Sequence, residues 1–280
     1  MPLPTIEIIA EQVRLALLED IGVEDVTACL LSDNQLVTAH LISRETAILC
    51  GQAWFNEVFK QLDPQIQVLW QAKEGTALSP NQVICTMTGQ TKAILTGERC
   101  AMNFLQTLSA TATTTQYYVD AVKGTGVRIL DTRKTIPNLR LAQKYAVTCG
   151  GGANHRFGLY DAILIKENHI KAAGSICKAV SSARLHYPEL EIQTEVESLD
   201  ELQEALTSGV QRILLDNFSI NLLKQAVELN ATHSKKARLE ASGGIELAQL
   251  KKIAETGIDD ISIGAITKHI QAIDLSLRFN

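Results

Sequence analysis

The stretch VRILDTRK at Val127–Lys134 begins a repeating pattern that decides the fold of this 280-residue chain. From here onward, short runs rich in β-branched and other apolar residues alternate with segments of helical composition. Strands that alternate with helices pair in parallel, and runs that are apolar almost throughout are buried on both faces of a sheet. The pattern favours a parallel α/β barrel, complete or incomplete, and leaves an open sheet as the alternative. The runs are VRILDTRK, YAVTCGGG, AILIKENH, EIQTEVES, RILLDNFS, ARLEASGG and DISIGAIT.

Most of these runs end in a polar or charged residue or in a glycine. In a parallel barrel, functional groups gather at the carboxyl ends of the strands, in the loops that lead to the helices. One charged residue at a strand end means little, but several in register predict a site. The residues are Asp131 with Arg133 and Lys134, then Lys166, Glu195, Asp216, Ser242 and Gly264.

The chain before Gly124 has a different, mixed order of helices and strands. Ile6, Ile9, Val13 and Leu17 recur at helical spacing. A second helical segment lies around 54–59, and a long Thr-rich helix is expected over 92–122. A mixed order of this kind predicts an α+β unit rather than an alternating one. Strands are expected within 36–50, 67–71 and 83–89.

Composition and charge describe an ordinary enzyme with no sign of a membrane or nucleic-acid role. The residues are 46% hydrophobic and 20% charged, and the formal net charge of −5 argues against nucleic acid as the main partner. No apolar run is long enough to span a membrane, and the start MPLPTIEIIAEQVR lacks the pattern of a secretory signal. Six scattered cysteines without a CxxC pair fit reduced cytosolic thiols better than disulfides or a zinc site. We therefore expect a cytoplasmic protein.

Two cationic clusters follow predicted strands in the second half. Arg133 and Lys134 are adjacent at a strand end, where an Arg fork matches a carboxylate or phosphate and Lys supplies a point charge. In GGGANHR, three glycines permit positive φ or close backbone approach just before His155 and Arg156. The alternatives are a solvated surface pair and a flexible turn. Asn138 after a proline fits a turn, since Asn tolerates the left-handed conformation.

The later strand ends carry a lysine, two carboxylates and two glycine-rich turns. Lys166 ends an interior-facing strand, and a buried lysine needs an anion, a Schiff-base role or a structural partner such as Glu195. Glu195 and Asp216 could act as acid and base, bind a divalent metal, stabilise positive charge on a sugar, or serve as counterions. Ser242-Gly243-Gly244 and Gly264 follow the last two strands, where barrels often hold a phosphate. The whole set suits a substrate with several negative charges.

The motifs resemble those of one known family. DTRKTIPNLRLAQKYAVTCGGGANHRFGLYDAILIKENHI at 131–170 is similar to the signature of quinolinate phosphoribosyltransferases, the decarboxylating nicotinate-nucleotide pyrophosphorylases of NAD biosynthesis. EDIGVEDVT at Glu19–Thr27 and GERCAMNFLQTLSATAT at Gly97–Thr113 also match, and the resemblance covers nearly the whole chain. Asn138 stands where the family usually has Gly, as does Glu24, and neither lies in the expected site.

The resemblance implies an N-terminal α+β sandwich domain over 1–110, followed by an incomplete parallel α/β barrel over 111–280, with 270–280 packing back on the first domain. It also implies a homodimer in which one subunit's N-terminal domain covers the barrel mouth of the other. Taken alone, Arg99 reads as a surface residue, but the resemblance places it in the neighbour's site.

The resemblance further implies a role for each candidate residue. Mg²⁺ is expected with phosphoribosyl pyrophosphate, held by Glu195 and Asp216 directly or through water. The catalytic residues are expected to be Lys134, Lys166, Glu195 and Asp216. The quinolinate ligands are expected to be Arg99, Arg133, His155, Arg156 and Lys166. The phosphoribosyl pyrophosphate ligands are expected to be Lys134, Glu195, Asp216, Ser242, Gly243, Gly244 and Gly264.

Three other functions stay open at the level of sequence. A family relative could act on a different anionic substrate. A barrel lyase could use Lys166 as a Schiff base, in which case borohydride would trap a carbonyl substrate on it. An anion-binding regulator would bind ligand without turnover.

Overall fold

The computed structural model describes residues 2–32 and 35–279 and divides into two compact units. The first unit contains the chain as far as Gln116, then Thr135–Gly151, and the chain from Ile266 onward. The second contains Tyr117–Lys134 and Gly152–Ala265. The chain therefore passes between the two units several times instead of completing one before it starts the other.

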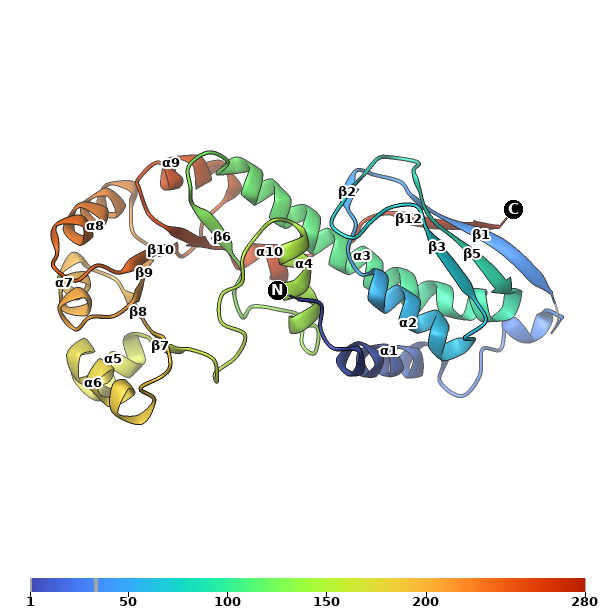
Figure 1. Cartoon of the computed structure of the whole chain (residues 1–280), viewed down its shortest axis with the longest axis horizontal. Helices are drawn as coiled ribbons and strands as arrows, with labels where there is room; N and C mark the ends of the chain where they lie inside the picture. Colours follow the sequence, from blue (N-terminus) through green and yellow to red (C-terminus); the bar gives the residue numbers. More distant parts are fainter. Residues whose placement is uncertain (1, 33–34, 280) are drawn as a thin grey trace. The chain divides into compact units, whose positions relative to one another are not determined.

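The first unit is built on an antiparallel sheet whose strand order is β12-β1-β5-β3 (Figure 1). The segment 270–280 contributes β12, which pairs with β1 so that Ala39 lies opposite Phe279. Asn280 lies outside the described residues. A separate two-stranded sheet pairs β2 with β4. The strands are β1 (Leu36–Ser43), β2 (Ala47–Ile48), β3 (Gln67–Trp70), β4 (Ala77–Leu78), β5 (Val83–Gln90) and β12 (Leu275–Phe279).

Helices supply the rest of the core of the first unit. Phe55 packs edge-on against both Phe59 and Trp70, and Trp54 is fully buried. The helical segments predicted at the N-terminus, around 54–59 and over 92–122 are all confirmed. The helices are α1 (Ile6–Ile21), α2 (Gln52–Leu62), α3 (Thr91–Ala121) and α4 (Arg140–Cys149), with a short 3₁₀ turn at Ala28–Leu30.

The second unit is an incomplete parallel barrel, as the sequence predicts. Its strand order is β6-β11-β10-β9-β8-β7, and every printed pair is parallel. The strands thus follow chain order from β7 to β11, and β6, the first strand of the unit, pairs with the last. The sheet is open between β6 and β7. The strands are β6 (Arg128–Leu130), β7 (Ile163–Ile165), β8 (Ile192–Val196), β9 (Arg212–Asp216), β10 (Arg238–Ser242) and β11 (Asp260–Ser262).

Helices α6 to α9 lie along the outside of this curved sheet (Figure 1). Serine side chains cap α6, α7 and α8, because Ser175, Ser198 and Ser219 each accept a hydrogen bond from a backbone amide of the first turn. The helices are α5 (Glu167–Ala173), α6 (Ile176–His186), α7 (Leu199–Thr207), α8 (Ile220–Thr232), α9 (Leu250–Ala254) and α10 (Ala265–Lys268), with a 3₁₀ turn at Leu247–Gln249.

One predicted strand is wrong. The run YAVTCGGG forms the end of α4 and the turn after it. Ala142 and Ala146 are both buried at helical spacing, and Val147 joins them on that face. The run is too short for its composition to distinguish a buried helix from a buried strand. It is helical because it continues the helix that begins at Arg140.

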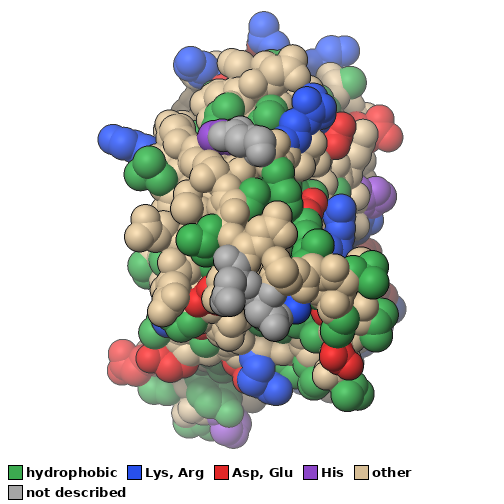
Figure 2. Space-filling model, turned by 90° about the vertical axis from the view of Figure 1, so that its right-hand side faces the viewer, with side chains coloured by type: hydrophobic (Ala, Val, Ile, Leu, Met, Phe, Trp, Pro, Cys, Tyr) green, Lys and Arg blue, Asp and Glu red, His purple; other side chains and the backbone are tan. Residues whose placement is uncertain are grey.

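Charge and apolar surface are mixed on the face of the first unit seen in Figure 2. Basic, acidic and hydrophobic side chains alternate there rather than forming a patch of one kind. Among the described residues, no helix combines the length and the apolarity that crossing a bilayer requires.

The turn after α4 uses its glycines for two different reasons. Gly151 has φ 82°, in the left-handed region that favours glycine. Gly150 has an ordinary φ of −81°, but a Cβ there would lie 2.2 Å from the carbonyl oxygen of Ala112 on α3. Asn138 has φ 62°, as expected from its position after a proline.

Gly150→Ala should destabilise the protein by about 1–3 kcal/mol, because α4 and α3 must separate to admit one methyl group. Asn138→Gly is the control, because it introduces glycine at a position whose φ already lies in the left-handed region. We expect it to change the free energy of unfolding by no more than about 0.5 kcal/mol. Urea unfolding followed by circular dichroism measures both. A wild-type midpoint for Gly150→Ala would contradict the close contact.

Candidate active site

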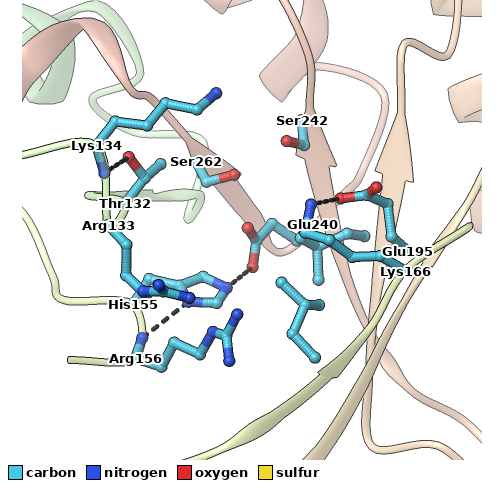
Figure 3. A pocket seen from close by; sticks show the side chains of 12 residues that line it. Thr132, Arg133, Lys134, His155, Arg156, Lys166, Glu195, Glu240, Ser242 and Ser262 are labelled. Atoms are coloured by element: carbon cyan, nitrogen blue, oxygen red, sulfur yellow. Dashed lines mark hydrogen bonds and ion pairs between the residues drawn. The ribbon is translucent and has the colours of Figure 1, made fainter. Parts of the chain in front are cut away.

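A cavity opens within the second unit at the carboxyl ends of its strands (Figure 3). Its volume of about 160 Å³ is comparable with the roughly 150 Å³ cavity that holds a benzene molecule in an engineered protein. Seven of its lining residues were predicted from sequence. They are Arg133, Lys134, His155, Arg156, Lys166, Glu195 and Ser242.

The floor of the cavity is formed by residues that sequence reasoning missed. Leu164, Leu214, Glu240 and Ser262 line it together with Thr132. Apart from Thr132, each of them stands two residues before a residue that the sequence analysis placed in the site. Those site residues are, in the same order, Lys166, Asp216, Ser242 and Gly264. Side chains two apart on a strand point to the same face, so this period could have identified the floor from the sequence.

The loop that carries His155 and Arg156 is fixed to the end of β6. Asp131, which is fully buried, accepts a hydrogen bond from the His155 backbone amide at 2.9 Å and another from the Asn154 side chain at 2.6 Å. Ala153 forms a parallel bridge with Leu130. The loop therefore extends the sheet at its open edge and directs the two cationic residues toward the cavity.

The His155 ring has a defined proton arrangement. The Arg156 backbone N–H donates to His155 Nδ1 at 2.8 Å, so a neutral imidazole carries its proton on Nε2. Nε2 lies 3.5 Å from Glu240 Oε2, and only 8% of the His155 side chain is exposed. His155 is thus held as an Nε2–H donor at one side of the cavity.

Arg133 and Arg156 lie on the same side of the cavity as His155 (Figure 3). Arg156 donates one hydrogen bond to the Ala162 carbonyl at 3.2 Å. Burial lowers the pKa of Arg156, and the neighbouring charge of Arg133 lowers it further. Two guanidinium groups that repel each other in a half-buried site favour a bound anion between them.

Lys166 and Glu195 face these cations from the other side. Lys166 Nζ donates to Glu195 Oε2 at 2.6 Å. The expectation of a buried lysine is wrong, because 47% of the Lys166 side chain is exposed, against 15% for Glu195. The strand ends at Ile165, and Lys166 already serves as the N-cap of α5, which turns its side chain toward the open mouth.

The remaining predicted residues surround this mouth without lining the cavity. Burial raises the pKa of Asp216, and the negative charge of Glu195 raises it further. Gly243 has φ 96°, and a Cβ there would lie 2.3 Å from Asn217 Oδ1, while Gly244 has φ 55°. A Cβ at Gly264 would lie 2.9 Å from Lys134 Cδ, so this glycine leaves room for the lysine.

Arg99 is not among the lining residues. It is an exposed residue of α3, in the first unit. Because the structure contains a single chain, it does not test whether Arg99 enters the site of a second subunit, and that role stays a prediction.

Glu240 is an unusual floor residue because it is an acid with no exposed surface. Arg212 Nη1 lies 3.3 Å from its Oε2, the oxygen that also faces His155. Burial raises the pKa of Glu240 to about 7, against the lowering effects of Ser262 and Arg212. Asp260, on the neighbouring strand, instead has a pKa of about 2, because Arg128, Arg238 and Arg212 offset its burial.

Family models match almost the entire chain. Residues 25–109 match the N-terminal domain and residues 111–278 the C-terminal domain of quinolinate phosphoribosyl transferase. The chain belongs to the quinolinate phosphoribosyltransferase family. The barrel, its cationic loop and its strand-end carboxylates are therefore those of a family member.

Individual relatives are similar to this chain in sequence over most of their lengths. A probable nicotinate-nucleotide pyrophosphorylase [carboxylating] from Synechocystis is 41% identical over 94% of this chain and 89% of its own. A protein of the same name from Bacillus subtilis is 39% identical over 93% of this chain and 89% of its own. The solved structure of the nicotinate-nucleotide pyrophosphorylase from Francisella tularensis has a TM-score of 0.96 and 47% identity, over 99% of this chain and 98% of that one.

Glu240→Gln should change how stability depends on pH. The folded-state pKa of Glu240, about 7, exceeds its ordinary value of 4.5, so the folded protein binds the proton more tightly than the unfolded chain does. The protonated Glu240 carboxyl therefore adds to the free energy of unfolding at low pH. Wild-type protein should lose this added stability as the pH rises from 4.5 to about 7, and the variant should not. The stability of Glu240→Gln relative to wild type is expected to rise from about pH 5 to about pH 8.

Thermal or urea unfolding at both pH values measures this difference. Glu228→Gln, on the exposed side of α8, is the control and should show no such trend. A pH-independent difference between Glu240→Gln and wild type would contradict the raised pKa.

Proposed function

We propose that this protein transfers the phosphoribosyl group of phosphoribosyl pyrophosphate to quinolinate and decarboxylates the product. The products are nicotinate mononucleotide, pyrophosphate and CO₂, and the reaction belongs to de novo NAD biosynthesis. The observation that carries the proposal is a ring-sized cavity lined by Arg133, His155, Arg156 and Lys166, in a chain whose barrel matches the family model over residues 111–278.

The cationic side of the cavity suits the two adjacent carboxylates of quinolinate. Arg133 and Arg156 offer planar forks that bind a carboxylate through two hydrogen bonds, and His155 offers an Nε2–H donor. Leu164 and Leu214 give the ring an apolar surface. A monocarboxylate such as nicotinate would leave part of this buried positive charge without a partner, which disfavours it.

The rest of the site suits the phosphoribosyl pyrophosphate. Lys134 can contact the pyrophosphate, and the turn at Ser242, Gly243 and Gly244 presents backbone amides to a phosphate. Glu195 and Asp216 fit a Mg²⁺ site, because two neighbouring carboxylates whose charges repel each other favour a bound cation. Mg²⁺ would neutralise charge that develops on the leaving pyrophosphate.

The first step needs positioning rather than a protein nucleophile. The pyridine nitrogen has a lone pair, which forms the bond to C1 of the ribose while the bond from C1 to the pyrophosphate oxygen breaks. No general base is required. The ribose carries positive charge as these bonds exchange, and the carboxylates of Glu195 and Asp216 stabilise that charge. Lys134 stabilises the negative charge on the departing pyrophosphate.

The second step breaks the bond between C2 of the ring and its carboxylate. The electron pair stays at C2, where the adjacent cationic ring nitrogen stabilises it, and C2 then takes up a proton as CO₂ leaves. Arg and Lys side chains hold the carboxylate in the orientation from which this bond breaks. The Schiff-base alternative is weaker, since Lys166 Nζ is paired with Glu195 Oε2 at 2.6 Å and 47% of its side chain is exposed, whereas a nucleophilic lysine is usually desolvated in an apolar pocket.

The direct test incubates the protein with quinolinate, phosphoribosyl pyrophosphate and Mg²⁺. Nicotinate mononucleotide and CO₂ should form in equal amounts, and nicotinate in place of quinolinate should give little product. If no product forms under these conditions, the proposed activity is wrong.

Arg133→Ala and Arg156→Ala should each raise the KM for quinolinate by about 10- to 100-fold, the loss of one charged hydrogen-bonded contact. The KM for phosphoribosyl pyrophosphate should change much less. Lys224→Ala, an exposed residue of α8, is the control and should leave both values unchanged. Equal effects on both substrates would argue against the division of the site into two sides.

The proposal includes a homodimer in which Arg99 of one subunit reaches the barrel of the other. Arg99→Ala and Lys166→Ala should each be inactive. Mixing the two with free subunit exchange should restore about a quarter of wild-type activity, since half the dimers are mixed and each has one intact site. Inactivity of the mixture after mass spectrometry has verified exchange would exclude the shared site.

A further inference from the structure

A second group of reactive side chains lies in the first unit, apart from the candidate active site. Cys50 directly precedes the N-cap of α2, Glu74 lies in the loop between β3 and β4, and Cys149 is the last residue of α4. One ligand atom of each lies within 4.8 Å of the others. We propose that Cys50, Glu74 and Cys149 bind one zinc-class divalent cation.

The spacing of the three atoms suits such an ion. Zinc binds cysteine sulfur at about 2.3 Å and carboxylate oxygen at about 2.0–2.2 Å, so two ligand atoms of one site lie no more than about 4.6 Å apart. Small side-chain rotations bring the group into this range. Two sulfur donors with one oxygen select zinc or a similar metal over Mg²⁺ or Ca²⁺, which prefer oxygen ligands only.

The surrounding structure holds two of the ligands in place. Cys50 is fully buried, and its backbone amide and carbonyl both hydrogen-bond to Ser109 Oγ of α3, at 2.9 and 3.1 Å. The Glu74 carboxylate accepts the amides of Gly51 and Gln52, at 2.8 and 3.2 Å. The carboxylate also accepts a hydrogen bond from the Cys50 thiol, and a metal that displaced this thiol proton would take up the same lone pair.

The third ligand is supported from its own helix. Tyr145, one turn before Cys149 on α4, hydrogen-bonds to both Cys149 and Glu74. The thiols of Cys50 and Cys149 are themselves in hydrogen-bond contact. Partners that orient metal ligands in this way are characteristic of protein metal sites.

Binding would release the two thiol protons, and the divalent ion would offset most of the negative charge of the resulting thiolates and of the Glu74 carboxylate. The site would join the end of α4 to the start of α2. Since Cys149 leads directly into the turn before His155, the ion would fix the position from which that loop begins.

Cobalt titration of the chelator-stripped full chain, in a non-thiol reductant and without substrates, tests the proposal. Wild type should bind one Co²⁺ per chain with a thiolate-to-cobalt charge-transfer band, and Zn²⁺ should displace it. Cys50→Ser and Cys149→Ser should each weaken or abolish the band. Cys177→Ser, an exposed thiol outside the group, is the control and should keep it. Glu74→Gln should retain the band with roughly 10-fold or weaker affinity.

Three results would overturn the proposal. They are the absence of a band in folded wild type, a band that survives in Cys149→Ser, and a mass 2 Da lower that reveals a disulfide between Cys50 and Cys149. If a cysteine variant does not fold by circular dichroism, anomalous scattering at the zinc edge from wild-type crystals grown with Zn²⁺ decides instead. The transferase assay is separate, so failure of one proposal does not affect the other.

Discussion

The buried carboxylate of Asp131 is the contact on which the candidate active site depends. Asp131 directly follows β6 at the edge where the barrel is open, and its carboxylate receives hydrogen bonds from both the Asn154 side chain and the backbone of His155. A buried carboxylate without such donors would be costly, so the loop and the strand end stabilise each other. Together with the parallel bridge between Ala153 and Leu130, this contact joins the cationic loop to the sheet.

The open edge of the barrel and the position of the loop are related. A closed barrel would pair β6 with β7, and the segment between them would be an ordinary crossover. Here the segment leaves the second unit, forms α4 in the first, and returns at Gly152. Ala153 then pairs with Leu130 in the place of a neighbouring strand. The gap thus gives His155 and Arg156 access to the cavity from the side.

Buried charge is organised in two layers below that cavity. Asp260 binds three arginine side chains and stays ionised, which stabilises the amino ends of the strands. Glu240, between this network and His155, has a pKa near neutrality. The alternation of side chains along β10 sets this arrangement, because Glu240 and Ser242 share the inner face while Leu239 and Ala241 take the other.

The sequence by itself determined the parallel barrel, the α+β unit, and most of the residues at the strand ends. These are local properties, since strand period, helix period and turn residues depend on neighbours in the chain. For the conformation of two segments, the predictions from sequence were wrong because the boundary of a neighbouring helix was not recognised. YAVTC became helix because α4 packs its alanines inward, and Lys166 is exposed because it caps α5. Only the tertiary structure brought Glu240 beneath His155 and brought Cys50, Glu74 and Cys149 together, because spacing along the chain carries no record of which loops meet in space.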